Sequence, residues 1–203
     1  MAHVVVLHGM WMNGLSMRVL AHRLRAAGHQ VDVLNYNMLL PQRGSIIDQV
    51  TDILRRDPHT HVVAHSLGGL IALKAIEQLD TPHLGRVVCL GSPIAGSHAA
   101  VNLARSGKLA RRAMHRHFPL LAEGVGSAVV CTQVGVVAGT RPAGLGRFFS
   151  GVSAPSDGTV AVKETCVPGL AGHAEIPCGH TGLVFSRKAA DLALRFIDHG
   201  RFD

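Results

Sequence analysis

The sequence predicts a doubly wound α/β fold, in which a mostly parallel sheet carries helices on both faces. Short runs rich in valine and isoleucine alternate along the 203 residues with segments of helical periodicity. Runs that are apolar almost throughout are typical of parallel strands covered on both sides. The alternation of strand and helix favours right-handed crossovers within one sheet. No repeat or long linker divides the chain, so residues 1–203 are expected to form a single domain.

Three strands and two helices are expected in the amino-terminal half. The strands are the β-branched runs at residues 3–8, 30–36 and 61–65. Residues 15–28 form a helix that stops at Gly28, a residue type that commonly ends helices. The apolar face of this helix is expected to contain Leu15, Val19, Leu20, Leu24 and Ala27. A second helix, 45–57, begins at Ser45, whose hydroxyl can cap the first turn.

The carboxyl-terminal half continues the alternation. Further strands are expected at residues 85–92, 128–140 and 173–179, and further helices at 67–79 and 186–200. The stretch 97–121 is helical in pattern and basic. The sheet should therefore contain about six strands, and in such sheets ligands bind at the carboxyl ends of the strands.

The chain is basic, with a formal charge of +7 from 20 basic and 13 acidic residues. Such a charge permits attraction to nucleic acid, anionic lipid or acidic substrates. The basic residues are dispersed and not interleaved with aromatic ones, so no nucleic-acid binding is expected. Weak contact with an anionic membrane surface is one interpretation of segment 102–118, and a solvated helix face is the other. The basic residues of this segment are Arg105, Lys108, Arg111, Arg112 and Arg116.

Neither a secretory signal nor a membrane span is expected, because the first apolar run is short and no run approaches about 20 residues. We therefore predict a cytoplasmic protein with reduced thiols, in which Cys166 and Cys178 would pair only after export. No metal or cofactor is expected. The histidine pairs 59/61 and 115/117 lack a matching set of further ligands at metal-site spacing.

The segment "VVAHSLGGLIAL" places one hydroxyl, that of Ser66, between a predicted strand and a predicted helix. Its neighbours at minus two and plus two are Ala64 and Gly68, which approximates the G-x-S-x-G nucleophile elbow with alanine in place of the first glycine. Small flanking residues permit the tight turn that exposes a nucleophile. The alternative is a serine that merely caps a helix.

A serine nucleophile needs a base, and fourteen histidines are available. In enzymes with such an elbow the chain order is serine, acid, histidine, with the histidine after the last strand. His180 follows the last predicted strand and is our candidate. His173 comes earlier, at the start of that strand, and His199 lies in the closing helix. His65, beside Ser66, is expected to be structural.

The acid must orient the imidazole and offset its charge. Asp157, in the turn-forming segment "APSDGTV", is our candidate, and an ordinary Asp-Gly turn is the alternative. Glu77 and Asp80 lie at the far end of the helix after Ser66. Glu164 is less well placed, near a predicted strand. We expect Asp157 to hold His180.

Two backbone amides should bind the oxyanion of the reaction. One belongs to Leu67, the residue after the nucleophile, and the other is expected in the loop "LHGMWMNG" after the first strand. In that loop Gly9 allows close approach to a ligand, and Met10 is the expected donor. Trp11 is expected to shape the substrate pocket beside Gly9. A generic glycine turn is the alternative.

These segments together resemble the α/β-hydrolase superfamily, and most closely its small bacterial lipases and esterases. The resemblance covers nearly the whole chain through "LHGMWMNG", "AHSLGG", "LGSPIAGS", "SDGTVAV" and "GHTGLVFS", in family order. It implies a catalytic triad of Ser66, Asp157 and His180, with oxyanion amides from Met10 and Leu67. The chain begins at what would be the family's third strand and lacks a large cap insertion. The resemblance thus implies a minimal fold in which only 97–121 could act as a small lid.

The expected activity is hydrolysis of a small-molecule carboxylic ester with an apolar acyl group, without a cofactor. Three alternatives use the same residues or the same fold. A thioesterase or an acyltransferase would form the same acyl-enzyme, and a protein that had lost activity could serve as a binding module. Neither the natural substrate nor the oligomeric state follows from the sequence.

Overall fold

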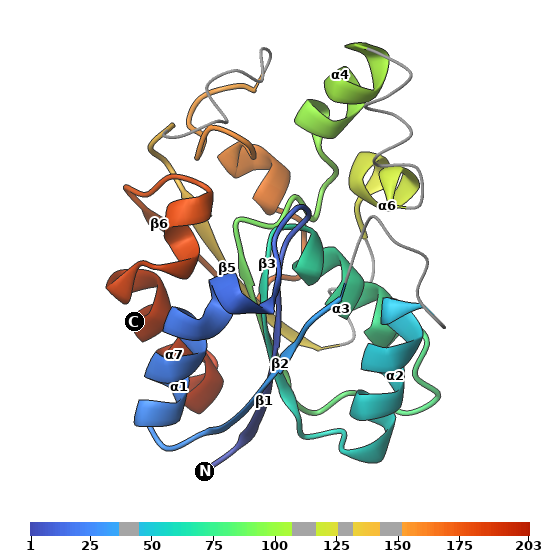
Figure 1. The fold of residues 1–203 in the computed structure, drawn as a ribbon, viewed down its shortest axis with the longest axis vertical. Helices are drawn as coiled ribbons and strands as arrows, with labels where there is room; N and C mark the ends of the chain where they lie inside the picture. The colour runs from blue at the N-terminus through green and yellow to red at the C-terminus, as the bar shows by residue number, and fades with distance from the viewer. Residues whose placement is uncertain (37–44, 107–116, 126–131, 143–151) are drawn as a thin grey trace.

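The computed structural model describes residues 1–36, 45–106, 117–125, 132–142 and 152–203. Six parallel strands form one sheet, in the order β2-β1-β3-β4-β5-β6 (Figure 1). The strands are β1 His3–Leu7, β2 Gln30–Leu34, β3 His61–His65, β4 Arg86–Leu90, β5 Gln133–Gly139 and β6 Gly172–Ile176. The predicted fold class is therefore confirmed.

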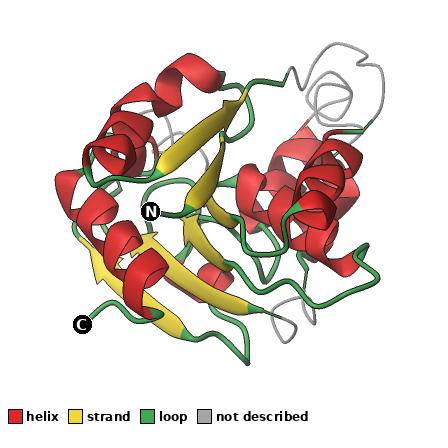
Figure 2. Ribbon diagram, turned by 90° about the horizontal axis from the view of Figure 1, so that it is seen from below, coloured by secondary structure: helices red, strands yellow, loops and turns green. Residues whose placement is uncertain are grey.

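Helices cover both faces of this sheet, and Figure 2 shows the strands between two groups of helices. Helix α1, Arg18–Ala26, and helix α7, Arg187–His199, lie on one face, and α2, Ile46–Arg56, and α3, Leu67–Glu77, on the other (Figure 1). Because side chains alternate along a strand, Val4 packs in the α1 and α7 core. Its neighbour Val5 packs in the α2 and α3 core.

Hydrogen bonds from side chains fix where two of these helices begin. The Ser45 hydroxyl accepts from the Ile47 amide at 3.1 Å, as predicted for the start of α2. Ser186 caps α7 in the same way, through the Ala189 amide. Helix α7 ends at Gly200, which adopts a left-handed conformation with φ of 74°.

The predicted apolar face of the first helix was wrong in three positions. Leu15 is 64% exposed and Val19 39% exposed, and Ala27, which follows the last residue of α1, is exposed too. Leu15 and Val19 are displaced by a turn of 3-10 helix, Gly14–Met17, which precedes α1 and rotates the chain before the α-helix begins at Arg18. The buried face of the first helical region consists instead of Met17, Leu20, Ala21 and Leu24.

The predicted helical segment 97–121 contains two described helices, α4, His98–Ser106, and α6, Phe118–Glu123. Residues 107–116 between them lie outside the described part, and with them four of the five basic residues of the predicted surface and the middle of the predicted lid. No inserted cap domain occurs among the described residues, as expected. Cys166 and Cys178 are both free thiols.

Two kinds of feature are absent from the described residues. None of the described helices is both long and apolar enough to cross a membrane. Within the same residues, no group of three or more His, Cys, Asp or Glu side chains could hold a metal ion.

The strand order creates a switch point between β1 and β3. From β1 the chain moves outward to β2, and then returns across β1 to β3 and onward to β6. The loops after β1 and β3 therefore leave the sheet in opposite directions, which opens a crevice at their carboxyl ends. Gly9 and Met10 follow β1, and Ser66 follows β3.

Candidate active site

Ser66 forms the one-residue turn between β3 and α3. Its φ of 54° and ψ of −124° are unusual for any residue other than glycine, so the turn is strained and the surrounding structure must hold it. The Ser66 amide donates to the Leu90 carbonyl of β4 at 2.9 Å. A side chain on Gly68 would lie 2.8 Å from the His8 carbonyl oxygen, so the small residue expected there is required by packing.

The three side chains predicted to act together are brought together by the fold. The Ser66 hydroxyl lies 2.9 Å from Nε2 of His180. Nδ1 of His180 lies 2.6 Å from Oδ2 of Asp157. A carboxylate only accepts, so Nδ1–H donates to Asp157 and Nε2 is left to accept from the hydroxyl. This tautomer is the one a base for Ser66 requires.

Asp157 is buried, and hydrogen bonds hold both of its oxygens. Its Oδ1 accepts from the amides of Thr159 at 2.9 Å and Val160 at 2.7 Å, while Oδ2 faces His180. The carboxylate is only 1% exposed, so these donors replace the solvation that it loses. The His180 amide also donates to the Asp157 carbonyl oxygen at 3.0 Å, which ties the two loops together.

His65 connects the nucleophile strand to the His180 loop. Its Nε2–H donates to the His180 carbonyl oxygen at 3.0 Å, and the two imidazole rings lie 4.7 Å apart. Burial lowers the pKa of His65 well below its usual value, so the ring is neutral at neutral pH. The sequence suggested only a structural role, because the partner of His65 is 115 residues away.

Two glycines that sequence reasoning did not single out provide room for the Asp157 and His180 pair. Gly91 follows β4 with φ of 58°, and a side chain there would lie 3.0 Å from Oδ2 of Asp157 and 3.3 Å from Nδ1 of His180. A side chain on Gly139, at the end of β5, would lie 2.7 Å from Cβ of Asp157. Both glycines lie near the carboxyl end of a predicted strand, and that position was the available signal.

The two predicted oxyanion amides belong to segments that adjoin Ser66. Leu67 begins α3, where unpaired amides and the helix dipole favour negative charge. Met10 donates its amide to no acceptor among the described residues. A side chain on Gly9 would lie 3.0 Å from Cβ of Ser66, so only glycine allows the Met10 loop to approach this closely. An anion bound at Ser66 would therefore lie near the amides of both Met10 and Leu67.

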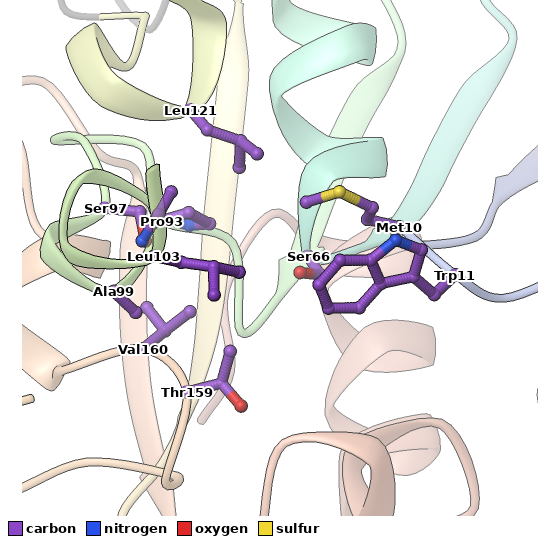
Figure 3. A pocket seen from close by; sticks show the side chains of 11 residues that line it. Met10, Trp11, Ser66, Pro93, Ser97, Ala99, Leu103, Leu121, Thr159 and Val160 are labelled. Carbon is purple, nitrogen blue, oxygen red and sulfur yellow. The ribbon is translucent and has the colours of Figure 1, made fainter. Parts of the chain in front are cut away.

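An apolar pocket opens beside the Ser66 hydroxyl. Met10 and Trp11 lie on one side of it, and Leu103, Ala99 and Val160 on the other (Figure 3). Trp11 is 55% exposed and adopts a φ of 59°, which turns the β1 loop into the mouth of the pocket. Gly9 does not line the pocket but lies behind it, against Ser66.

Glu164 has a role that the sequence did not reveal. Its Oε1 accepts from the His98 amide at 2.7 Å and lies 2.8 Å from Nδ1 of the same residue. Its Oε2 accepts from the Ala161 amide at 2.8 Å. The buried carboxylate therefore joins the start of α4 to the loop that carries Asp157, and so joins two walls of the pocket. It does not contact His180.

No protein-family model matches the chain, and no curated protein matches it by sequence. Solved structures do match. The mature lipase BlEst2 of Bacillus licheniformis is 19% identical, with a TM-score of 0.72 over 98% of this chain and 91% of that one. A pyrethroid hydrolase from Sphingobium faniae is 14% identical, with a TM-score of 0.65 over 98% of both chains.

An extracellular alpha/beta-hydrolase from a Paenibacillus species is also similar. It is 14% identical, with a TM-score of 0.58 over 96% of this chain and 98% of that one. Likeness at these identities establishes the fold.

Proposed function

We propose that this chain, which has the α/β-hydrolase fold, is a serine hydrolase that cleaves carboxylic esters with apolar acyl groups. One observation carries the proposal. A strained, partly exposed serine, an imidazole and a buried carboxylate form a single hydrogen-bonded row, at 2.9 and 2.6 Å, beside an apolar pocket. The same three groups form the catalytic triad of serine hydrolases.

The first half of the reaction would acylate Ser66. Its Oγ attacks the ester carbonyl carbon while Nε2 of His180 takes the hydroxyl proton. Asp157 holds the imidazole in the required tautomer and stabilises its positive charge. The amides of Met10 and Leu67 bind the oxygen that becomes negative. The bond from carbon to the leaving oxygen then breaks, and His180 gives its proton to the departing alcohol.

The second half would release the acid. His180 accepts a proton from a water molecule as that water attacks the acyl carbon. The same two amides bind the second oxyanion. When the bond to Ser66 Oγ breaks, His180 returns the proton to the serine, and the free carboxylic acid leaves the pocket.

The lining of the pocket supports an apolar acyl group. Its walls near Ser66 are mainly aliphatic, with Met10, Leu103, Leu121 and Val160 among them. Such walls contribute to binding in proportion to the apolar area removed from water, about 25 cal/mol per Å². Each methylene that fits the pocket should therefore raise kcat/KM until the chain outgrows it.

The test is hydrolysis of p-nitrophenyl esters of graded acyl length by the wild-type chain and by Ser66→Ala. We expect turnover with an optimum in acyl length, and a loss of at least about 10⁴-fold in kcat for the variant. Retention of activity in Ser66→Ala would contradict the proposal. Ser97→Ala is the matched control, because Ser97 also lines the pocket but is not part of the row.

The same assays separate the alternatives. Faster cleavage of a thioester than of the oxygen ester with the same acyl chain would favour a thioesterase. Ester formation from an added alcohol would favour an acyltransferase. A chain that fails both to hydrolyse these esters and to react with a fluorophosphonate at Ser66 would instead be a binding protein.

A further inference from the structure

His8 is a buried histidine that the proposed reaction does not use. It follows β1 directly, is 0% exposed, and stacks on Tyr36 with ring centroids 3.9 Å apart. Its Nδ1 lies 2.8 Å from the Gly9 carbonyl oxygen, and its Nε2 lies 3.3 Å from the Tyr36 amide nitrogen. The Tyr36 hydroxyl donates to the carbonyl oxygen of His8 itself.

These contacts fix the tautomer of His8 from two directions. A backbone amide can only donate, so Nε2 must accept from Tyr36 and carries no proton. A carbonyl oxygen can only accept, so Nδ1 must carry the proton and donate it to Gly9. Burial lowers the pKa of His8, which keeps the ring neutral and the arrangement intact at neutral pH.

The peptide bond that His8 holds is the one that contains the Met10 amide. A trans peptide is planar, and its carbonyl and N–H point in opposite directions, so fixing one end fixes the other. Strand β1 lies between β2 and β3 in the sheet. His8, which binds the Gly9 carbonyl oxygen, stacks on Tyr36 on the β2 side of β1. The Met10 N–H, at the other end of the peptide, should therefore point toward the β3 side, where Ser66 lies.

We infer that His8 is a positioning residue, which holds the Gly9–Met10 peptide so that the Met10 amide is aimed at the oxyanion formed on Ser66. The inference rests on the proposed function. It assigns no contact between His8 and substrate. A hydrogen bond accepted by the carbonyl also polarises the peptide and strengthens its N–H as a donor to a modest extent.

The test compares His8→Leu with His8→Asn, whose amide can donate from near the position of Nδ1. Loss of a whole oxyanion donor costs about 10²- to 10³-fold in kcat. For His8→Leu we expect kcat to fall about 10- to 100-fold with KM changed less than about threefold. A trifluoromethyl ketone, which forms an oxyanion on the enzyme, should lose affinity by a similar factor. His8→Asn should recover most of both losses.

The matched control is His83→Leu. His83 is also a buried histidine, with Nε2 on the Thr60 carbonyl oxygen at 2.9 Å and Nδ1 on the Thr132 hydroxyl at 3.1 Å. It lies before β4, at the amino ends of the strands, whereas Ser66 lies at their carboxyl ends. This variant should lose stability as His8→Leu does, but keep its kcat and its affinity for the ketone.

A second measurement needs no variant. Nitrogen NMR of the wild-type chain should show His8 neutral with its proton on Nδ1. A proton on Nε2, or a folded His8→Leu enzyme with kcat within twofold of wild type, would overturn the inference. Activity retained in Ser66→Ala would instead overturn the proposed function, and the NMR result would still report on His8.

Discussion

Hydrogen bonds from neighbouring residues fix the main chain at His180. The carbonyl and the amide of His180 are both bound, the first by His65 and the second by the Asp157 carbonyl oxygen. In the proposed reaction, neither hydrogen bond involves a reacting atom. Each fixes where the imidazole stands, and displacements of about 1 Å at a reacting group can cost about 10²-fold in rate.

The hydrogen bond from His65 to His180 therefore predicts a rate effect without a binding effect. His65→Leu removes the donor, so the His180 loop should relax and kcat should fall at least about tenfold, with KM nearly unchanged. His65→Gln, which can donate an amide proton from a similar distance along its side chain, should restore much of the rate. Steady-state kinetics on one p-nitrophenyl ester would measure this. Equal kcat in the wild-type and Leu enzymes, both folded, would contradict it.

At the scale of elements, the carboxyl ends of four neighbouring strands each contribute one part of the site. Strand β1 leads to Met10, β3 to Ser66, and β4 to Gly91, and β5 precedes the loop of Asp157. The sheet is held by a parallel ladder, so these ends keep a fixed spacing. Gly91 fits because it has no side chain to push Asp157 and His180 apart.

Gly91→Ala should therefore damage activity more than stability. Gly28→Ala is the matched control: Gly28 also has a left-handed φ, of 95°, but an added side chain there meets nothing within 4 Å. Both variants strain the backbone by about 1–2 kcal/mol. Only Gly91→Ala should lower kcat, by about 10²-fold. Thermal melts and ester kinetics of the two proteins would separate strain from displacement, and parallel losses of rate in both would count against the argument.

The sequence predicted the elements better than it predicted the contacts between them. Apolar runs and the alternation of strand and helix are local patterns, and the six-strand sheet that they predicted is confirmed. Ser66 was found because its elbow is also local. The roles of His8, Glu164 and Gly91 were not predicted, because their partners come from other loops; the one local signal was the position of Gly91 near the end of a predicted strand. The roles assigned to Ser66, Asp157 and His180 stay predictions, for which the hydrogen-bonded row is the support.

At the scale of the whole molecule, buried and half-buried histidines make folding sensitive to acid. Burial lowers the pKa values of His8, His61, His65, His83 and His173, and that of His61 to about 4. The unfolded chain, with imidazoles near 6.5, then binds more protons than the folded chain at mildly acidic pH. Stability that is complete above about pH 6.5 is lost as the pH falls below that value.

We accordingly expect the urea midpoint and the Tm to fall between pH 7 and pH 5, and to change little from these groups between pH 7 and pH 8. Each kcal/mol lost should lower Tm by about 2–4 °C for a chain of this length. Urea denaturation at a series of pH values would measure the effect. A free energy of unfolding that stays constant or rises on acidification to pH 5 would show that these imidazoles do not govern stability.

The loop that carries Asp157 performs two tasks, and under the proposed function this constrains how the acyl specificity could change. The side chains of Thr159 and Val160 line the pocket, while their amides hold the carboxylate. Substitutions at Thr159 or Val160 that enlarge the pocket would disturb the Asp157 carboxylate as well as the fit of the acyl chain. Ala99, on α4, faces the same cavity from a separate element. Changes in acyl specificity should therefore occur in the pocket wall formed by α4. Substitutions there can alter the shape of the pocket without disturbing the hydrogen bonds of Asp157.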